Sequence, residues 1–135
     1  MSLLLDISKD VLSQYEDRFG LAVDNTISLK PEDGNGTISI VDFPGDLSLY
    51  QFDFNLREPF SMSYYNPSDS DWYFLNVNLS KISVRKEVNG NMMDLQRYLP
   101  TGILFYTPGI RVKSQTLPNK SFEVALVRFH KRFLD

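Results

Sequence analysis

The stretch GDLSLYQFDFNL, residues 45–56, alternates apolar and polar side chains along most of its length. A period of two predicts a β-strand with one face in the core and the other toward solvent. The apolar side chains change parity within the stretch, since Leu47 and Leu49 give way to Tyr50 and Phe52. Because a slip of one residue turns every side chain to the opposite face, we expect a bulge near Tyr50 or a strand that bends from one sheet into another.

Similar short stretches follow on both sides, separated by turns rich in Gly, Pro, Asn and Asp. Asn89-Gly90 is the sharpest hairpin signal, because this pair favours the turn that matches strand twist. Residues 91–100 fit either a strand or a helical turn that ends at Pro100. About eight or nine short strands favour a sandwich or barrel over alternating α/β units. Besides residues 47–56, the expected strands lie within residues 26–30, 36–43, 60–65, 72–80, 82–88, 102–107, 110–116 and 122–133.

One amphipathic helix is expected near the N-terminus, over residues 7–19. Asp6 or Ser8 can cap its start, and Gly20 suits its C-terminal end. We expect the helix to pack on the outside of the barrel or to cover one end. Its apolar side chains recur every fourth residue, at Ile7, Val11, Tyr15 and Phe19.

Length and composition indicate a single structural domain without export or membrane segments. The chain has 135 residues, of which 42% are hydrophobic and 23% charged, as is usual for globular domains. No apolar run approaches the roughly 20 residues of a membrane helix, and no basic leader precedes the first apolar residues, so we expect no membrane association. Zero cysteines fit a reducing compartment, and we expect the cytoplasm. The predicted division is a helical segment at residues 1–23 and a β-domain at residues 24–135.

The residue inventory contains no signature of an enzyme. The single histidine, His130, cannot by itself assemble a metal site or a catalytic triad. Neither a Gly-x-Ser-x-Gly elbow nor a phosphate-binding glycine loop is present. We therefore expect no catalytic residues, no metal and no cofactor, and we interpret His130 as structural. The net charge of −3 argues against a surface built to neutralise phosphates.

The order of these segments resembles the N-terminal cupin-like sensor domain of AraC-type transcription regulators. The resemblance rests on the leading helix, GDLSLYQFDFNL, DSDWYFLNVNLS, EVNG, RYLPTGILFYTPG and the closing FEVALVRFHKRFLD, and it covers the chain from about Thr26 onward. It implies a mainly β, double-stranded β-helix (jelly roll) with an N-terminal α-helix, which binds an effector or supports dimerisation. In metal-using cupins a histidine follows the Pro-Gly turn within a few residues; Val112 stands near that position here.

The aromatic strands offer two interpretations. The first is that their rings simply fill the core. The second is that they line a cavity for a small organic effector, which polar side chains orient. The candidate ligand-binding residues are Tyr50, Phe52, Phe54, Arg57, Trp72, Asn76, Asn78 and Tyr106.

We therefore expect an effector-sensing and/or dimerisation domain of an AraC-type regulator, which forms a homodimer and reaches DNA only through a C-terminal domain absent from this sequence. The alternative is a stand-alone carbohydrate- or small-ligand-binding β-sandwich module. That alternative predicts exposed coplanar rings and a secretion signal.

Overall fold

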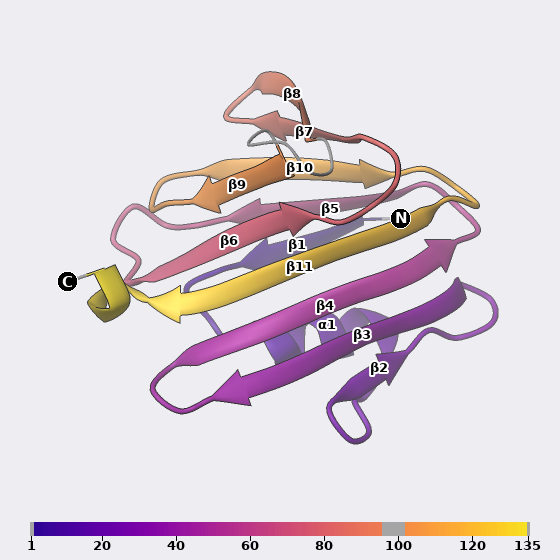
Figure 1. Cartoon of the computed structure of the whole chain (residues 1–135), viewed down its shortest axis with the longest axis horizontal. Coiled ribbons are helices and arrows are strands. Elements are labelled where there is room, and N and C mark those ends of the chain that lie inside the picture. The colour runs from indigo at the N-terminus through magenta and orange to yellow at the C-terminus, as the bar shows by residue number, and fades with distance from the viewer. Residues whose placement is uncertain (1, 96–101, 135) are drawn as a thin grey trace.

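The computed structural model describes residues 2–95 and 102–134, and these form two packed β-sheets with one α-helix. Sheet A contains five strands, in the spatial order β1 (Ser2–Asp6), β5 (Phe60–Tyr65), β10 (Arg111–Thr116), β7 (Val84–Val88) and β8 (Asn91–Leu95). Sheet B contains six, in the order β2 (Thr26–Ser28), β3 (Gly34–Phe43), β4 (Leu47–Leu56), β11 (Ser121–His130), β6 (Trp72–Asn78) and β9 (Ile103–Tyr106). Figure 1 shows sheet B in front of sheet A. This is the expected mainly β jelly roll.

The helix α1 (Val11–Phe19) begins four residues later than predicted, because the chain before it is a strand. Residues 2–6 form β1, which pairs in parallel with β5, and the Ile7 N–H continues this pairing by donating to the Tyr65 carbonyl. The helix can start only after these pairs end. Asp10, not Asp6 or Ser8, caps it by accepting a hydrogen bond from the Leu12 N–H.

The helix covers the inner face of sheet B where sheet A does not reach. Figure 1 shows α1 behind β3 and β4. Its apolar stripe is buried completely, and the Tyr15 ring packs edge-on against Phe52 at 5.2 Å while its hydroxyl lies 3.1 Å from that of Tyr64 on β5. The helix is therefore a third side of the core.

The prediction of a bulge near Tyr50, or of a strand that bends there into the other sheet, is wrong. β4 keeps one uninterrupted antiparallel register with β3 from Phe43 to Gly34 and with β11 from Phe129 to Ser121. The apolar residues change parity because β4 has two apolar faces at this end. Tyr50 points into the core, whereas Leu49 lies on the outer face of sheet B and is only partly buried.

Two further expectations concern the segment after β7. The Asn89-Gly90 hairpin is confirmed, since both residues have positive φ, 48° and 87°, between β7 and β8. Residues 91–95, where strand and helix were both open, form β8. Residues 96–100 lie outside the described residues. Within residues 2–95 and 102–134 no helix is long and apolar enough to span a bilayer.

We predict that Gly36→Ala destabilises the fold by more than about 2 kcal/mol. Gly36 has φ +115°, and a Cβ there would collide with the backbone of Asp53 and Phe54 on β4. Gly90→Ala is the matched control, because Gly90 also has positive φ but no atom within 4 Å of an added Cβ. Urea unfolding of both variants measures the difference in their free energies of unfolding. Equal losses of stability would contradict the close approach of the β3 and β4 backbones at Gly36.

Candidate ligand site

Four polar side chains meet inside the barrel on the side opposite α1, and we call them the interior polar cluster. Lys86 comes from β7, Ser114 from β10, Asn76 from β6 and Tyr106 from β9. Lys86 and Ser114 are register partners on neighbouring strands of sheet A. Each of the four is at most 1% exposed. Both sheets therefore contribute polar groups to one buried place in the core.

The Tyr106 hydroxyl is the centre of the cluster. It accepts hydrogen bonds from Lys86 Nζ and from Asn76 Nδ2, each at 3.0 Å. The Tyr106 ring is held by Tyr64 at 5.7 Å and Phe74 at 6.1 Å between centroids. Packing on the ring thus fixes the position of the hydroxyl group.

Lys86 is buried without a counter-ion. None of the ion pairs among the described residues involves it. Burial disfavours the charged ammonium and lowers the pKa of Lys86 to about 7. Burial likewise raises the pKa of Tyr106 well above its usual value, so its hydroxyl stays protonated at neutral pH. The cluster is poised to gain a single positive charge near neutral pH.

Two atoms of the cluster have no hydrogen-bond partner in the described part of the chain, Asn76 Oδ1 and Ser114 Oγ. Buried polar atoms are paired in more than about nine cases in ten, and leaving one unpaired costs about 1–3 kcal/mol. The core therefore carries polar groups that its own packing does not satisfy.

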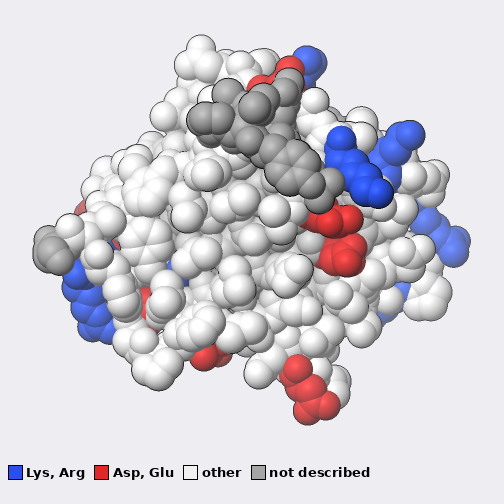
Figure 2. All heavy atoms as spheres, in the orientation of Figure 1, with Lys and Arg blue, Asp and Glu red and all other residues white. Residues whose placement is uncertain are grey.

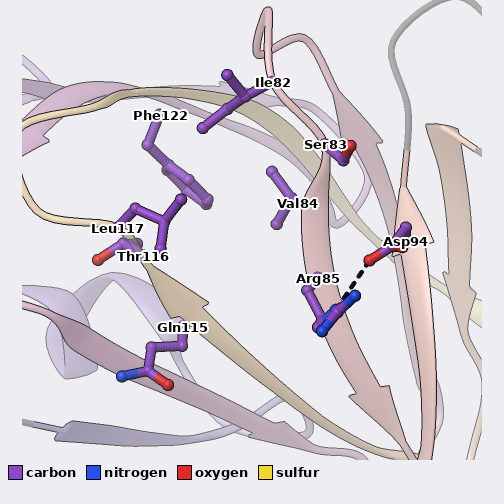
Figure 3. A pocket seen from close by; sticks show the side chains of 9 residues that line it. All are labelled: Ile82, Ser83, Val84, Arg85, Asp94, Gln115, Thr116, Leu117 and Phe122. Carbon is purple, nitrogen blue, oxygen red and sulfur yellow. Dashed lines mark hydrogen bonds and ion pairs between the residues drawn. The ribbon is translucent and has the colours of Figure 1, made fainter.

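A cavity of about 340 Å³ opens beside the cluster, between the start of β7 and the end of β10. Val84 and Thr116, which face the interior, lie in its wall, each two residues from Lys86 or Ser114 on the same strand face. That step is roughly 7 Å. In Figure 3, Phe122 and Leu117 line one side, and the pair formed by Arg85 and Asp94, at 3.1 Å, lies on the other.

Three of the predicted ligand-binding residues belong to the aromatic core beneath α1. Tyr50, Phe52 and Phe54 point inward from β4 and are nearly fully buried. Their rings pack on α1, with Tyr50 and Phe52 against Tyr15. The Tyr50 ring lies 6.4 Å from that of Phe74, which in turn packs on Tyr106 of the interior polar cluster.

The other five predicted residues lie in different places. Asn76 and Tyr106 belong to the interior polar cluster. Asn78 is also buried, but its side chain connects the end of β6 to β8 and to the following turn. It donates a hydrogen bond to the Leu95 carbonyl and accepts one from the Ser80 N–H. Arg57 is exposed just after β4. Trp72 is half-buried and supports Arg128.

Arg128 binds the N-terminal segment to the end of the barrel. Its guanidinium lies 3.7 Å from the centroid of the Trp72 ring and donates to the carbonyl oxygens of Ile7 and Lys9. His130 packs edge-on against Trp72, and its Nδ1 accepts a hydrogen bond from the Arg132 N–H. These contacts fit the expectation that His130 has a structural role.

The sequence reasoning missed Lys86 and Ser114, although the alternation of their strands contains the signal. In β7, Lys86 shares its parity with Val84 and Val88, and in β10, Ser114 shares its parity with Val112. A polar residue in step with the apolar residues of a strand points into the core.

The place where a cupin histidine would follow the Pro-Gly turn does not fit a metal ion. Val112 lies there on β10, with Tyr64 and Val88 as its register partners on β5 and β7. Metal ions of this kind need imidazole or carboxylate donors that converge on one point. In the part of the chain that the structure describes, no three His, Cys, Asp or Glu side chains come together in this way.

Comparison with solved structures places the chain among cupin folds. The cupin domain of Cnp3 from Schizosaccharomyces pombe superposes with a TM-score of 0.54 at 5% identity, over 73% of this chain and 66% of that domain. KdgF from Halomonas sp. gives 0.52 at 12% identity, over 82% and 90%, and a cupin 2 conserved barrel domain protein from Salinispora arenicola gives 0.50 at 10%, over 77% and 83%. No protein-family model and no curated protein matches the sequence. At these identities the likeness establishes the fold, and the chain has the cupin barrel.

Proposed function

We propose that this barrel is the effector-sensing and dimerisation domain of a cytoplasmic, AraC-type transcription regulator, and that it is not itself catalytic. The observation that carries the sensing role is Lys86, which is buried inside the barrel beside unpaired polar atoms and has no counter-ion among the described residues. A buried charge of this kind destabilises a fold. A ligand that completes the hydrogen bonds of Lys86 and of the unpaired atoms beside it would explain why a lysine lies there.

The aromatic rings favour this function over the carbohydrate-binding alternative. A sugar platform presents flat rings to solvent, but the rings inside the barrel are buried. On the outer face of sheet B, Tyr73 and Phe129 stack on each other, with an interplanar angle of 14°. One face of each of these two rings is therefore covered by the other ring.

The dimerisation role is supported by the outer face of sheet B. The outward-facing residues of its six strands are mostly apolar or uncharged; among those described, only Asp53 and Glu123 carry charge, and they are register partners at one end. Figure 2 shows the same face as mostly uncharged, with acidic side chains toward one side of it. Several of its large apolar side chains are exposed, including Val41, Phe43, Ile103 and Phe105.

The size of this face matches what a second copy of the chain needs. Six strands of three to ten residues, about 4.8 Å apart and at about 3.3 Å per residue, give roughly 700 Å². A stable interface buries about that area on each partner. The two carboxylates at one end suit the polar rim of such an interface. Helix α1 offers no comparable surface, because its apolar stripe is buried in the core.

We predict that Lys86 makes stability rise with pH between about 7 and 10. The pKa of Lys86 is about 7 in the folded chain, whereas an unfolded lysine titrates near 10.4. The unfolded state binds more protons in this window, so the free energy of unfolding increases by up to about 1.4 kcal/mol per pH unit. Urea unfolding from pH 6 to 10 should show this rise in the wild type and not in Lys86→Met. Lys113→Met, which removes an exposed lysine of β10, is the control.

We predict that the wild-type chain is a dimer and that Phe105→Glu makes it a monomer. Phe105 is 37% exposed on the outer face of β9, where a carboxylate would be buried by a partner sheet. Leu21→Glu, at the most exposed leucine of the loop after α1, should leave the dimer intact. Sedimentation velocity measures both variants. A wild type that stays monomeric at high protein concentration would rule out this interface.

We predict that residues 1–135 alone do not bind DNA in a sequence-specific manner. Specific recognition needs an element that enters a groove and basic residues that hold the backbone. The only α-helix in the described residues is packed into the core through Val11, Tyr15 and Phe19, and Lys131 and Arg132 at the chain end already pair with Asp71 and Asp46. A mobility-shift assay at physiological salt tests this; specific retardation by these residues alone would overturn the sensor-domain proposal.

A further inference from the structure

The interior polar cluster has more hydrogen-bond donors than acceptors. The Tyr106 hydroxyl already accepts two hydrogen bonds, from Lys86 and Asn76, so its own proton remains to be donated. Ser114 Oγ has a hydroxyl proton and no partner, and a lysine ammonium has three donors, of which one is used on Tyr106. Against these four N–H and O–H donors stand two unpaired acceptor atoms, Asn76 Oδ1 and the oxygen of the Ser114 hydroxyl itself.

The charges around Lys86 point to the same kind of partner. The groups that face it from β6, β9 and β10 are Asn76, Tyr106 and Ser114, none of which is a carboxylate. The next titratable side chain inward is Tyr64 on β5, whose hydroxyl is shared with Tyr15. Burial raises the pKa of Tyr64, so it too is neutral at physiological pH. No negative charge of the described core compensates an ammonium here.

We propose that the interior polar cluster binds the carboxylate of a small organic acid, with Lys86 as its counter-ion and Tyr106 and Ser114 as hydrogen-bond donors. This assignment rests on the proposed sensing function and names the class of effector. A carboxylate supplies two acceptor oxygens and the missing negative charge together. A neutral carbonyl would accept hydrogen bonds but leave Lys86 unpaired, and a cation would be repelled.

The adjoining cavity indicates the remainder of the ligand. Its volume of about 340 Å³ lies at the small end of the range for ligand pockets. Val84, Leu117 and Phe122 give it apolar walls. Val84 and Thr116 separate the cavity from Lys86 and Ser114, so entry of the carboxylate requires these two side chains to turn aside. The ligand is therefore a short monocarboxylic acid with an apolar body, whose carboxylate lies at Lys86 and whose body fills the cavity.

The experiment is a calorimetric titration of the full chain with straight-chain monocarboxylates of two to eight carbons and with benzoate, each paired with its primary amide. Carboxylates that fit should bind at pH 6. Their affinity should be at least tenfold lower at pH 9, where Lys86 is neutral. The matched amides should not bind at either pH. Lys86→Met should abolish carboxylate binding, and Tyr106→Phe should weaken it about tenfold. Lys113→Met, at a neighbouring exposed lysine, should bind as the wild type does.

A second measurement separates ligand binding from any effect on folding. The ¹³Cε resonance of Lys86 should titrate near pH 7 in the free protein, and a bound carboxylate should shift that midpoint upward by one unit or more. If amides bind as well as acids, and binding depends on Lys86, the sensing function stands and the carboxylate assignment is wrong. If no acid binds and none of them changes the titration of the Lys86 resonance, both the carboxylate assignment and its support for sensing are overturned.

Discussion

The fold depends on covering the inner face of sheet B, which carries more than half of the buried aromatic side chains among the described residues. Sheet A covers one part of this face, and α1 covers the part beneath β3 and β4. Tyr15 joins the three layers, because its ring packs on Phe52 of sheet B and its hydroxyl reaches Tyr64 of sheet A. This arrangement makes the α1 side of the barrel a dense aromatic core, and leaves polar residues to the opposite side, around Tyr106.

Lys86 lowers the stability of such a core, because burying its amine removes that group from water. A methionine or leucine of similar length would fill the same space without the desolvation of an amine. The Tyr106 hydroxyl relieves part of that cost with one hydrogen bond, but the unpaired Asn76 Oδ1 and Ser114 Oγ add to it. Groups that lower the stability of the isolated fold are characteristic of functional sites, such as those that bind a ligand.

The sequence was sufficient for the fold class but not for the site, and the residues show why. Strand alternation and the Asn89-Gly90 turn are local signals, so most strands and the β7–β8 hairpin were predictable. Strand β1 was not predictable, because it pairs with residues of β5 that lie 59 positions away, which gives no local signal and also displaces the helix start. Of the predicted ligand residues only Asn76 and Tyr106 meet Lys86, since aromatic residues suggest a pocket and a core equally well. Parity alone would have placed Lys86 inside.

The same alternation couples the two proposed roles. On β9, Tyr106 points inward to the interior polar cluster, and its neighbour Phe105 points outward beside Tyr73 and Phe129. On β6, Asn76 and Leu75 divide in the same manner. Successive side chains of one strand are attached to the same backbone, so a backbone shift at Tyr106 also moves Phe105. An effector that shifts the β9 backbone at Tyr106 therefore also displaces the outer face of β9, and a partner copy that binds the two positions unequally converts occupancy of the barrel into a change in dimerisation.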